Sequence, residues 1–147
     1  EISRMVNREE QGNQLINQIQ TTFRKLPTIN HQLLTCCYFI WRKPYMVAAN
    51  STFINHLIHF FGTRNMFENE ERYPEINPEQ IAEMKPDFIF LSSEPYKFSE
   101  KHIEEFQSFS PASKVVLVNG EMFSWYGSRL QFTADYFLQL RKRLGLV

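Results

Sequence analysis

The chain has 147 residues, the size of one ordinary domain that can bury a sizeable core. Sixteen basic and sixteen acidic side chains cancel, so composition gives no electrostatic reason to expect nucleic acid or an anionic membrane surface as a partner. Fourteen Phe, six Tyr and two Trp predict a dense core together with an aromatic surface.

Residues 1–26 predict one long helix that is polar on every face between residues 7 and 14. A helix with apolar ends and a polar middle suits a strut that crosses solvent between two packed bodies. The chain starts within this pattern and lacks an initiator Met, so we expect a fragment that contains one of those bodies. The apolar positions of the strut are Ile2, Met5, Val6, Leu15, Ile16, Ile19, Phe23 and Leu26.

Buried strands are predicted beyond Pro27 from short apolar runs at residues 33–41, 87–91 and 114–118, with a shorter segment around 65–67. Continuous runs of this length, bounded by turn residues, are typical of strands buried on both faces, as in parallel sheets. Helical patterns alternate with them and predict right-handed crossovers. The predicted fold is therefore α/β, with a mainly parallel sheet covered on both sides.

The predicted helices are recognised by their capping residues. Gly62 and Pro86 end the first two helices of the α/β region, and the last helix carries three cations, residues 141–143, at its negative end. The predicted helix starts are Asn50 or Ser51, Asn77 with Pro78 and Gln80, Ser99, and about Ser128.

Aromatic residues gather in the loops that follow the predicted strands. These loops share the carboxyl edge of a parallel sheet, where open α/β folds bind ligands. The loop at 119–127 is the richest, and its large apolar groups either pack beneath it or wait for a partner. The aromatic residues of this edge are Trp41, Tyr45, Tyr73, Tyr96, Trp125 and Tyr126, with Met122 and Phe123 beside them.

Charged residues in the same loops favour a planar or bulky ligand that bears carboxylates or amides, because rings supply area and Arg supplies a bidentate grip. The alternative is a set of solvated charges over a partly packed aromatic rim. No nucleophile with a nearby His appears, which argues against a catalytic triad, and Asn119-Gly120 is no phosphate loop. The charged residues are Arg42, Lys43, Arg72, Glu94, Glu121 and Arg129.

No metal site and no cofactor is predicted. His56 and His59 are three apart on a predicted helix, a spacing that can hold a metal, but no third ligand is evident. Cys36 and Cys37 are neighbours in a strand, so they point to opposite faces and are predicted to be buried free thiols. Glu79 lies in a first helical turn, where a carboxylate stabilises the helix dipole.

Three phrases, at residues 41–58, 72–95 and 114–130, carry a resemblance to a known family. WRKPYMVAANSTFINHLI, RYPEINPEQIAEMKPDFIFLSSEP and KVVLVNGEMFSWYGSRL resemble the carboxyl-terminal lobe of the cobalamin-binding and iron-siderophore-binding receptors of ABC importers, which are helical backbone metal receptor-like proteins. The resemblance implies a Rossmann-like three-layer lobe at residues 27–147, preceded by an inter-lobe backbone helix at 1–26. The amino-terminal lobe would be absent from this chain.

In that family two lobes close on a metal chelate, so the resemblance implies a non-enzymatic substrate-binding component in the periplasm or cell envelope. Its ligand would be cobalamin, an iron-siderophore or haem, delivered to the permease. Glu79 matches the lobe-surface acid that docks on a permease Arg. By position, the cleft would be lined by Trp41, Tyr45, Tyr73, Glu121 and Trp125, with Arg129 near it; the charged and aromatic edge adds Arg42, Glu94 and Tyr126.

Two other functions remain open on the residues alone. One is a flavodoxin-like enzyme domain that binds a flavin or nucleotide at the same edge, although it needs a phosphate-cradling loop that the sequence lacks. The other is a homo-oligomeric interaction module in which the aromatic edge is the interface.

Overall fold

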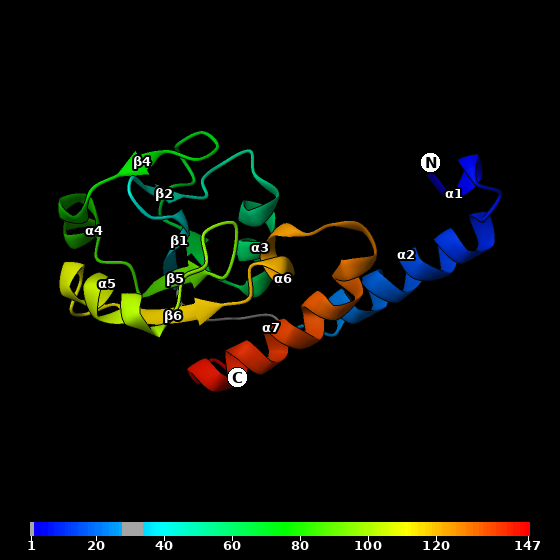
Figure 1. Cartoon of the computed structure of the whole chain (residues 1–147). Helices are drawn as coiled ribbons and strands as arrows, with labels where there is room; N and C mark the ends of the chain where they lie inside the picture. Colours follow the sequence, from blue (N-terminus) through cyan, green and yellow to red (C-terminus); the bar gives the residue numbers. More distant parts are fainter. Residues whose placement is uncertain (1, 28–33) are drawn as a thin grey trace. The chain divides into compact units, whose positions relative to one another are not determined.

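A computed structural model describes residues 2–27 and 34–147 (Figure 1). The chain divides into two compact units, one formed by residues 1–28 and 125–147 and the other by residues 29–124. We describe each unit by itself. The predicted start of the first strand, Leu33, lies outside the described residues.

Within residues 34–124, the larger unit is built on a six-stranded sheet whose centre is parallel, as predicted. Strand β1 (Thr35–Trp41) pairs with β5 (Phe88–Ser92), and β5 pairs with β6 (Lys114–Val118). The pairing aligns Tyr38 with Phe90 and Phe90 with Val116. All five residues of β5 are buried, as expected for a strand covered on both faces.

Two antiparallel strands at the other edge of β1 were not predicted. Strand β3 (Arg64–Asn65) pairs parallel with the start of β1, β2 (Tyr45–Val47) pairs antiparallel with its end, and β4 (Glu75–Ile76) pairs antiparallel with β2. The residues predicted as a loop after β1 thus turn straight back along it. Strands of two or three residues are too short to show a period-2 pattern.

Helices cover both faces of the sheet, which confirms the three-layer α/β architecture (Figure 1). On one face Phe39 and Leu91 share a buried cluster with Ile81 of α4 (Pro78–Met84) and Phe106 of α5 (Ile103–Phe109).

On the other face, aromatic rings fill the space between sheet and helices. The Tyr38 ring lies 5.1 Å from that of Phe123 in α6 (Glu121–Ser124), and the Phe90 ring lies 5.5 Å from that of Phe61 in α3 (Phe53–Phe61). The loop predicted at 119–127 therefore contains a one-turn helix. Its Met122 and Phe123 are buried.

The predicted cap Asn77 is confirmed, whereas Ser99 precedes a 3-10 turn that leads into α5 and the last helix begins at Leu130. The predicted start of α3 needs a correction. Helix α3 is capped by Thr52, whose Oγ1 accepts from the Asn55 N–H at 3.1 Å, and not by Asn50 or Ser51. The Thr52 hydroxyl also donates to the Ala49 carbonyl at 2.7 Å, which fixes its rotamer for capping. Gly62 ends α3 in the left-handed conformation, as predicted.

The smaller unit contains α1 (Ile2–Met5), α2 (Glu9–Arg24), a 3-10 turn (Gly127–Arg129) and α7 (Leu130–Leu144), with α2 packed along α7. The continuity predicted for residues 1–26 is wrong, because Asn7 takes a left-handed φ of 52° between α1 and α2. A Cβ on Gly12 would lie 2.6 Å from Ser3 Oγ, so glycine permits α1 to fold against α2.

Helix α7 buries one stripe of side chains, which includes Phe137 and Leu140. Thr133, Phe137 and Arg141 are buried, whereas Phe132 is exposed. The Arg141 guanidinium donates to the Pro27 carbonyl at 2.8 Å, and its burial lowers its pKa. Across residues 2–27 and 34–147, none of the helices combines the length and apolar character that crossing a bilayer requires.

The capping box of α4 gives a testable prediction. Asn77 Oδ1 accepts from the Gln80 N–H at 2.9 Å, and Gln80 Oε1 accepts from the Asn77 N–H at 2.8 Å. Because Ile81 ties α4 to the core, Asn77→Ala should lower the free energy of unfolding by ~1 kcal/mol, measured by urea denaturation. Asn77→Ser, which keeps a capping oxygen, is the control. Equal losses in the two variants would contradict the capping role.

Candidate functional site

Trp41 stands at the carboxyl end of β1 and is 40% exposed. Its ring meets that of Tyr96 edge-on at 5.8 Å, and the Tyr96 N–H donates to the Ile40 carbonyl at 3.2 Å. The loop after β5 is thereby tied to the end of β1. The carboxyl edge of this unit presents one half-exposed indole against a fixed tyrosine.

His102 is hydrogen-bonded to the Tyr96 hydroxyl. It is buried in the 3-10 turn Glu100–His102, and its Nδ1 accepts from the Ser99 N–H at 3.0 Å. The other ring nitrogen, Nε2, lies 3.2 Å from the Tyr96 hydroxyl, and the two groups are hydrogen-bonded.

Arg42 and Tyr45, both predicted to contact ligand, meet on one carboxylate of α5. Arg42 Nε donates to both oxygens of Glu105, at 3.0 and 3.1 Å, and the Tyr45 hydroxyl donates to Glu105 Oε1. The Arg42 and Glu105 side chains keep 25% and 23% of their surface exposed. This three-member cluster closes the turn between β1 and β2.

The pKa values of the cluster follow from its burial and contacts. Burial, with the hydrogen bond to Glu105 second, raises the pKa of Tyr45 to about 12. Burial alone would raise the pKa of Glu105, but the hydrogen bonds from Tyr45 and Arg42 outweigh it and lower that pKa. The hydrogen bond to Glu105 raises the pKa of Arg42. At neutral pH the cluster is thus an ion pair with a neutral phenol.

Glu94 is engaged between the loops after β5 and β6. Its Oε1 accepts from Ser124 Oγ at 2.7 Å, and a Cβ on Gly120 would lie 2.5 Å from its Cγ and 2.4 Å from Ser92 Oγ. The two loops therefore pack in direct contact. Glu121 begins α6 beside them and is half-buried.

The remaining predicted residues of the larger unit lie around β4. Ile76 of β4 pairs with Tyr45, so α4 begins beside the turn that follows β1, with Glu79 exposed in its first turn. Tyr73 lies three residues before Ile76. The carbonyl of the neighbouring Pro74 accepts from the Val47 N–H. Tyr73 is exposed and precedes the first residue of β4, Glu75, by two positions.

Trp125, Tyr126 and Arg129 belong to the smaller unit. Trp125 is 45% exposed and Tyr126 77% exposed, and the Arg129 guanidinium carbon lies 5.4 Å from the centre of the Trp125 ring. This cation-π contact orients an exposed indole. The loop predicted to be wholly aromatic thus divides into a buried pair, Met122 and Phe123, and an exposed pair.

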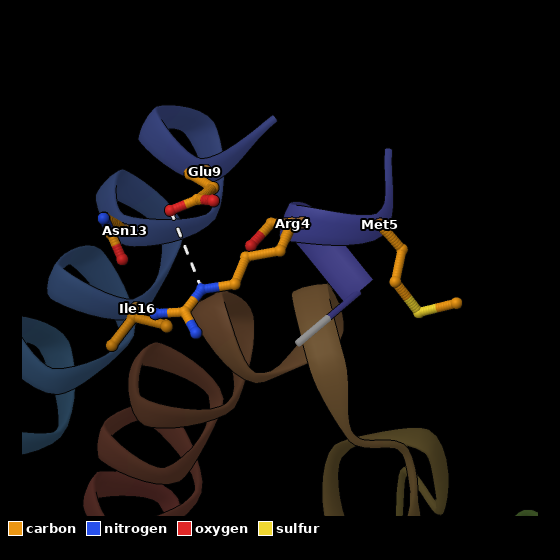
Figure 2. A pocket seen from close by; sticks show the side chains of 6 residues that line it. Arg4, Met5, Glu9, Asn13 and Ile16 are labelled. Carbon is orange, nitrogen blue, oxygen red and sulfur yellow. Dashed lines mark ion pairs between the residues drawn. The ribbon is translucent and has the colours of Figure 1, made fainter. Parts of the chain in front are cut away.

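A hollow in the smaller unit lies between α1 and α2 (Figure 2). Arg4 reaches toward Glu9, with Nε 3.7 Å from Oε2, and both side chains are largely exposed. Ile16 lies further along α2. A wet ion pair of this kind contributes little free energy.

Residues with metal-binding chemistry do not converge in the described part of the chain, where no three His, Cys, Asp or Glu side chains form a candidate ligand set. His56 and His59 are exposed on α3. Cys36 and Cys37 are buried free thiols, as predicted.

Sequence reasoning missed His102 of the 3-10 turn and Glu105 of α5. His102 is hydrogen-bonded to Tyr96, and Glu105 to Arg42 and Tyr45. Neither shows a local signal, since Glu105 follows Glu100 and Glu104 in a charged helix. Only the pairing of β2 with β1 brings Tyr45 and Arg42 to the same carboxylate.

Comparison with solved structures shows shared architecture at low identity. The periplasmic haem-binding protein HutB of Vibrio cholerae has a TM-score of 0.70 and 17% identity, over 97% of this chain and 60% of that one. The vitamin B12-binding protein BtuF of Vibrio cholerae gives 0.61 and 21%, over 91% and 51%. An ABC-type Fe3+-hydroxamate transport protein from Saccharomonospora viridis gives 0.69 and 14%, over 98% and 52%.

The chain spans at most 60% of the length of these three proteins, and identities this low show the fold alone. No curated protein matches the sequence. A sequence model of the periplasmic binding protein family matches residues 1–113, well over half of the chain. The chain therefore belongs to the periplasmic binding protein family.

Proposed function

We propose that the chain is the carboxyl-terminal part of the substrate-binding component of an ABC importer. It captures a metal chelate against a second lobe and hands it to the membrane permease. The protein acts in the periplasm or cell envelope as a carrier and catalyses no reaction. In this proposal residues 27–147 act as one lobe, and residues 1–26 connect it to an amino-terminal lobe outside this chain.

The half-exposed Trp41 at the carboxyl edge of the sheet carries this proposal. The indole at the end of β1 offers a flat apolar surface, and Tyr96, whose N–H is bonded to the Ile40 carbonyl, lies against it. Such a surface suits a planar or bulky macrocycle better than a small polar solute. In the other unit, Trp125 with Arg129 offers a second indole beside a cation.

The ligand class is supported by the proteins that share the fold. Their names give haem, vitamin B12 and Fe3+-hydroxamate as cargo, which are all metal chelates. The flavodoxin-like alternative lacks a phosphate-cradling loop in the sequence, and the family match favours transport.

The proposed ligand residues fall into two groups. Trp41, Tyr73, Trp125 and Tyr126 supply exposed aromatic surface, and Glu121 and Arg129 supply polar contacts. Arg42, Tyr45 and Glu94 are already hydrogen-bonded to other side chains. Any contact that these three side chains make with ligand is therefore made from a fixed position.

The 147-residue chain alone should bind chelates weakly, because a one-sided platform buries far less than the ~70% or more of ligand surface that a pocket covers. Absorbance and calorimetric titrations with haemin, aquocobalamin and ferrichrome measure this. The same chain joined to its amino-terminal lobe should bind one probe at least ~100-fold more tightly, as expected for contacts on both sides.

Trp41→Ala in the two-lobe protein should weaken that binding, and His56→Ala, an exposed change on α3, is the control. Micromolar or tighter binding by the chain alone would contradict a cleft between lobes. A flavin spectrum in the purified protein would instead favour the enzyme alternative.

Glu79 should affect transport without affecting ligand affinity. It is exposed in the first turn of α4, where we propose that it docks on an Arg of the permease. Glu79→Arg should reduce uptake into vesicles more than Glu79→Ala, since it adds like-charge repulsion to the loss of a pair. The free energy of unfolding should fall by no more than ~1 kcal/mol.

The neighbouring exposed Glu83→Arg, at the other end of α4, controls for the change in net charge. Unchanged uptake by Glu79→Arg would leave this residue with a helix-dipole role only. Weakened chelate binding would place it in the ligand site.

A further inference from the structure

We propose that Glu105 is a positioning residue, which holds the turn between β1 and β2 and through it keeps Trp41 in a fixed orientation at the carboxyl edge. The inference deepens the proposed function, since it rests on Trp41 being a ligand-facing surface. Glu105 itself contacts no ligand in this proposal.

The backbone alone holds this turn weakly. Strand β2 has three residues, and its register with β1 shifts between Phe39 and Trp41, so regular pairing ends just before the turn. Lys43 takes a left-handed φ of 62° within it. A short, irregular ladder fixes a strand end poorly. The side chains that close the turn therefore add to the order that the few backbone bonds supply.

Glu105 links the two sides of the turn. Arg42 directly follows Trp41, the last residue of β1, and Tyr45 is the first residue of β2. Both donate to the same carboxylate, with both Arg42 contacts charge-assisted. One side chain of α5 thus fixes the residue that follows the indole and the residue that starts the next strand.

His102 lies three residues before Glu105 and acts through a different neighbour of Trp41. Its Nε2 is hydrogen-bonded to the hydroxyl of Tyr96, whose ring lies edge-on to the indole. Residues three apart on a helical segment share a face. The same face of the Glu100–Phe109 segment therefore supports Trp41 twice, through Tyr96 and through the Arg42 turn.

The fold does not depend on the Glu105 carboxylate in the same way. Without it, the Tyr45 ring still packs against Phe106 and Phe109, each at 5.5 Å between ring centres. The buried cluster on this face of the sheet contains no atom of Glu105. Loss of the carboxylate should loosen the turn while the core remains folded.

Fluorescence of the 147-residue chain tests this without any ligand. The chain has two Trp, so Trp125→Phe leaves Trp41 as the sole emitter. In that background Glu105→Ala should increase acrylamide quenching of Trp41 about twofold and lower its anisotropy, as local loosening predicts. Glu105→Gln keeps an acceptor for Tyr45 but no charge for Arg42, so it should restore part of the difference. Circular dichroism checks that each variant is folded.

Two controls separate positioning from general destabilisation. Glu104→Ala removes the same charge from the exposed neighbouring residue of α5 and should leave Trp41 unchanged. Asp87→Asn weakens the contacts of Asp87 Oδ2 with the Thr35 N–H and hydroxyl at the opposite end of β1, so it should lower the melting temperature without changing the quenching. Unchanged quenching in folded Glu105→Ala, or an equal change in either control, would overturn the proposal.

Titration of the two-lobe protein with native Trp125 completes the test, using whichever of haemin, aquocobalamin and ferrichrome the parent protein binds. Glu105→Ala should weaken binding of that probe about tenfold and Glu105→Gln less, as expected for lost preorganisation. Wild-type affinity in a variant with increased quenching would overturn the link to ligand binding. If the parent protein binds neither haemin, aquocobalamin nor ferrichrome, the proposed function fails, and the fluorescence result still decides the role of Glu105 at the turn.

Discussion

Burial of a parallel sheet on both faces is the constraint from which the rest of the larger unit follows. β1 and β5 carry large apolar side chains in both directions, so each face needs its own cover of helices. Phe106 and Ile81 cover one face, and Phe61 and Phe123 the other. With both faces closed, the strand ends are the part of the sheet left for binding, and Trp41 lies at one of them.

The parts of the fold that sequence predicted are those with strong local patterns. Apolar runs located β1, β5 and β6, and the Asn77-Pro78 start and Gly62 end were correct because capping chemistry is local. The break at Asn7 was missed because residues 7–14 are polar on every face, so no interruption of an apolar pattern marks it. The short strands β2 and β4 were missed because they are decided by pairing between distant residues, such as Tyr45 and Ile76, which are 31 positions apart.

The residue types of the candidate site could be predicted, but which of its side chains face solvent and which are held by neighbours could not. Residue type alone placed Trp41, Arg42 and Tyr45 at one edge, yet it could not distinguish a side chain that faces solvent from one held by a neighbour. Trp41 remains half-exposed, whereas Arg42 and Tyr45 are hydrogen-bonded to the carboxylate of Glu105. Glu105 lies 63 positions from Arg42 and 60 positions from Tyr45 in the sequence. Such tertiary contacts override what a loop sequence indicates.

The paired cysteines in β1 have a consequence for following the molecule in solution. Cys36 and Cys37 are fully buried on opposite faces of the sheet, and burial raises the pKa of Cys36 to about 12 and also raises that of Cys37. Since the thiolate is the reactive form, alkylating reagents can modify either residue only when the sheet opens around β1. The rate at which each of the two thiols is alkylated therefore reports how often the centre of the sheet opens, with one thiol for each face.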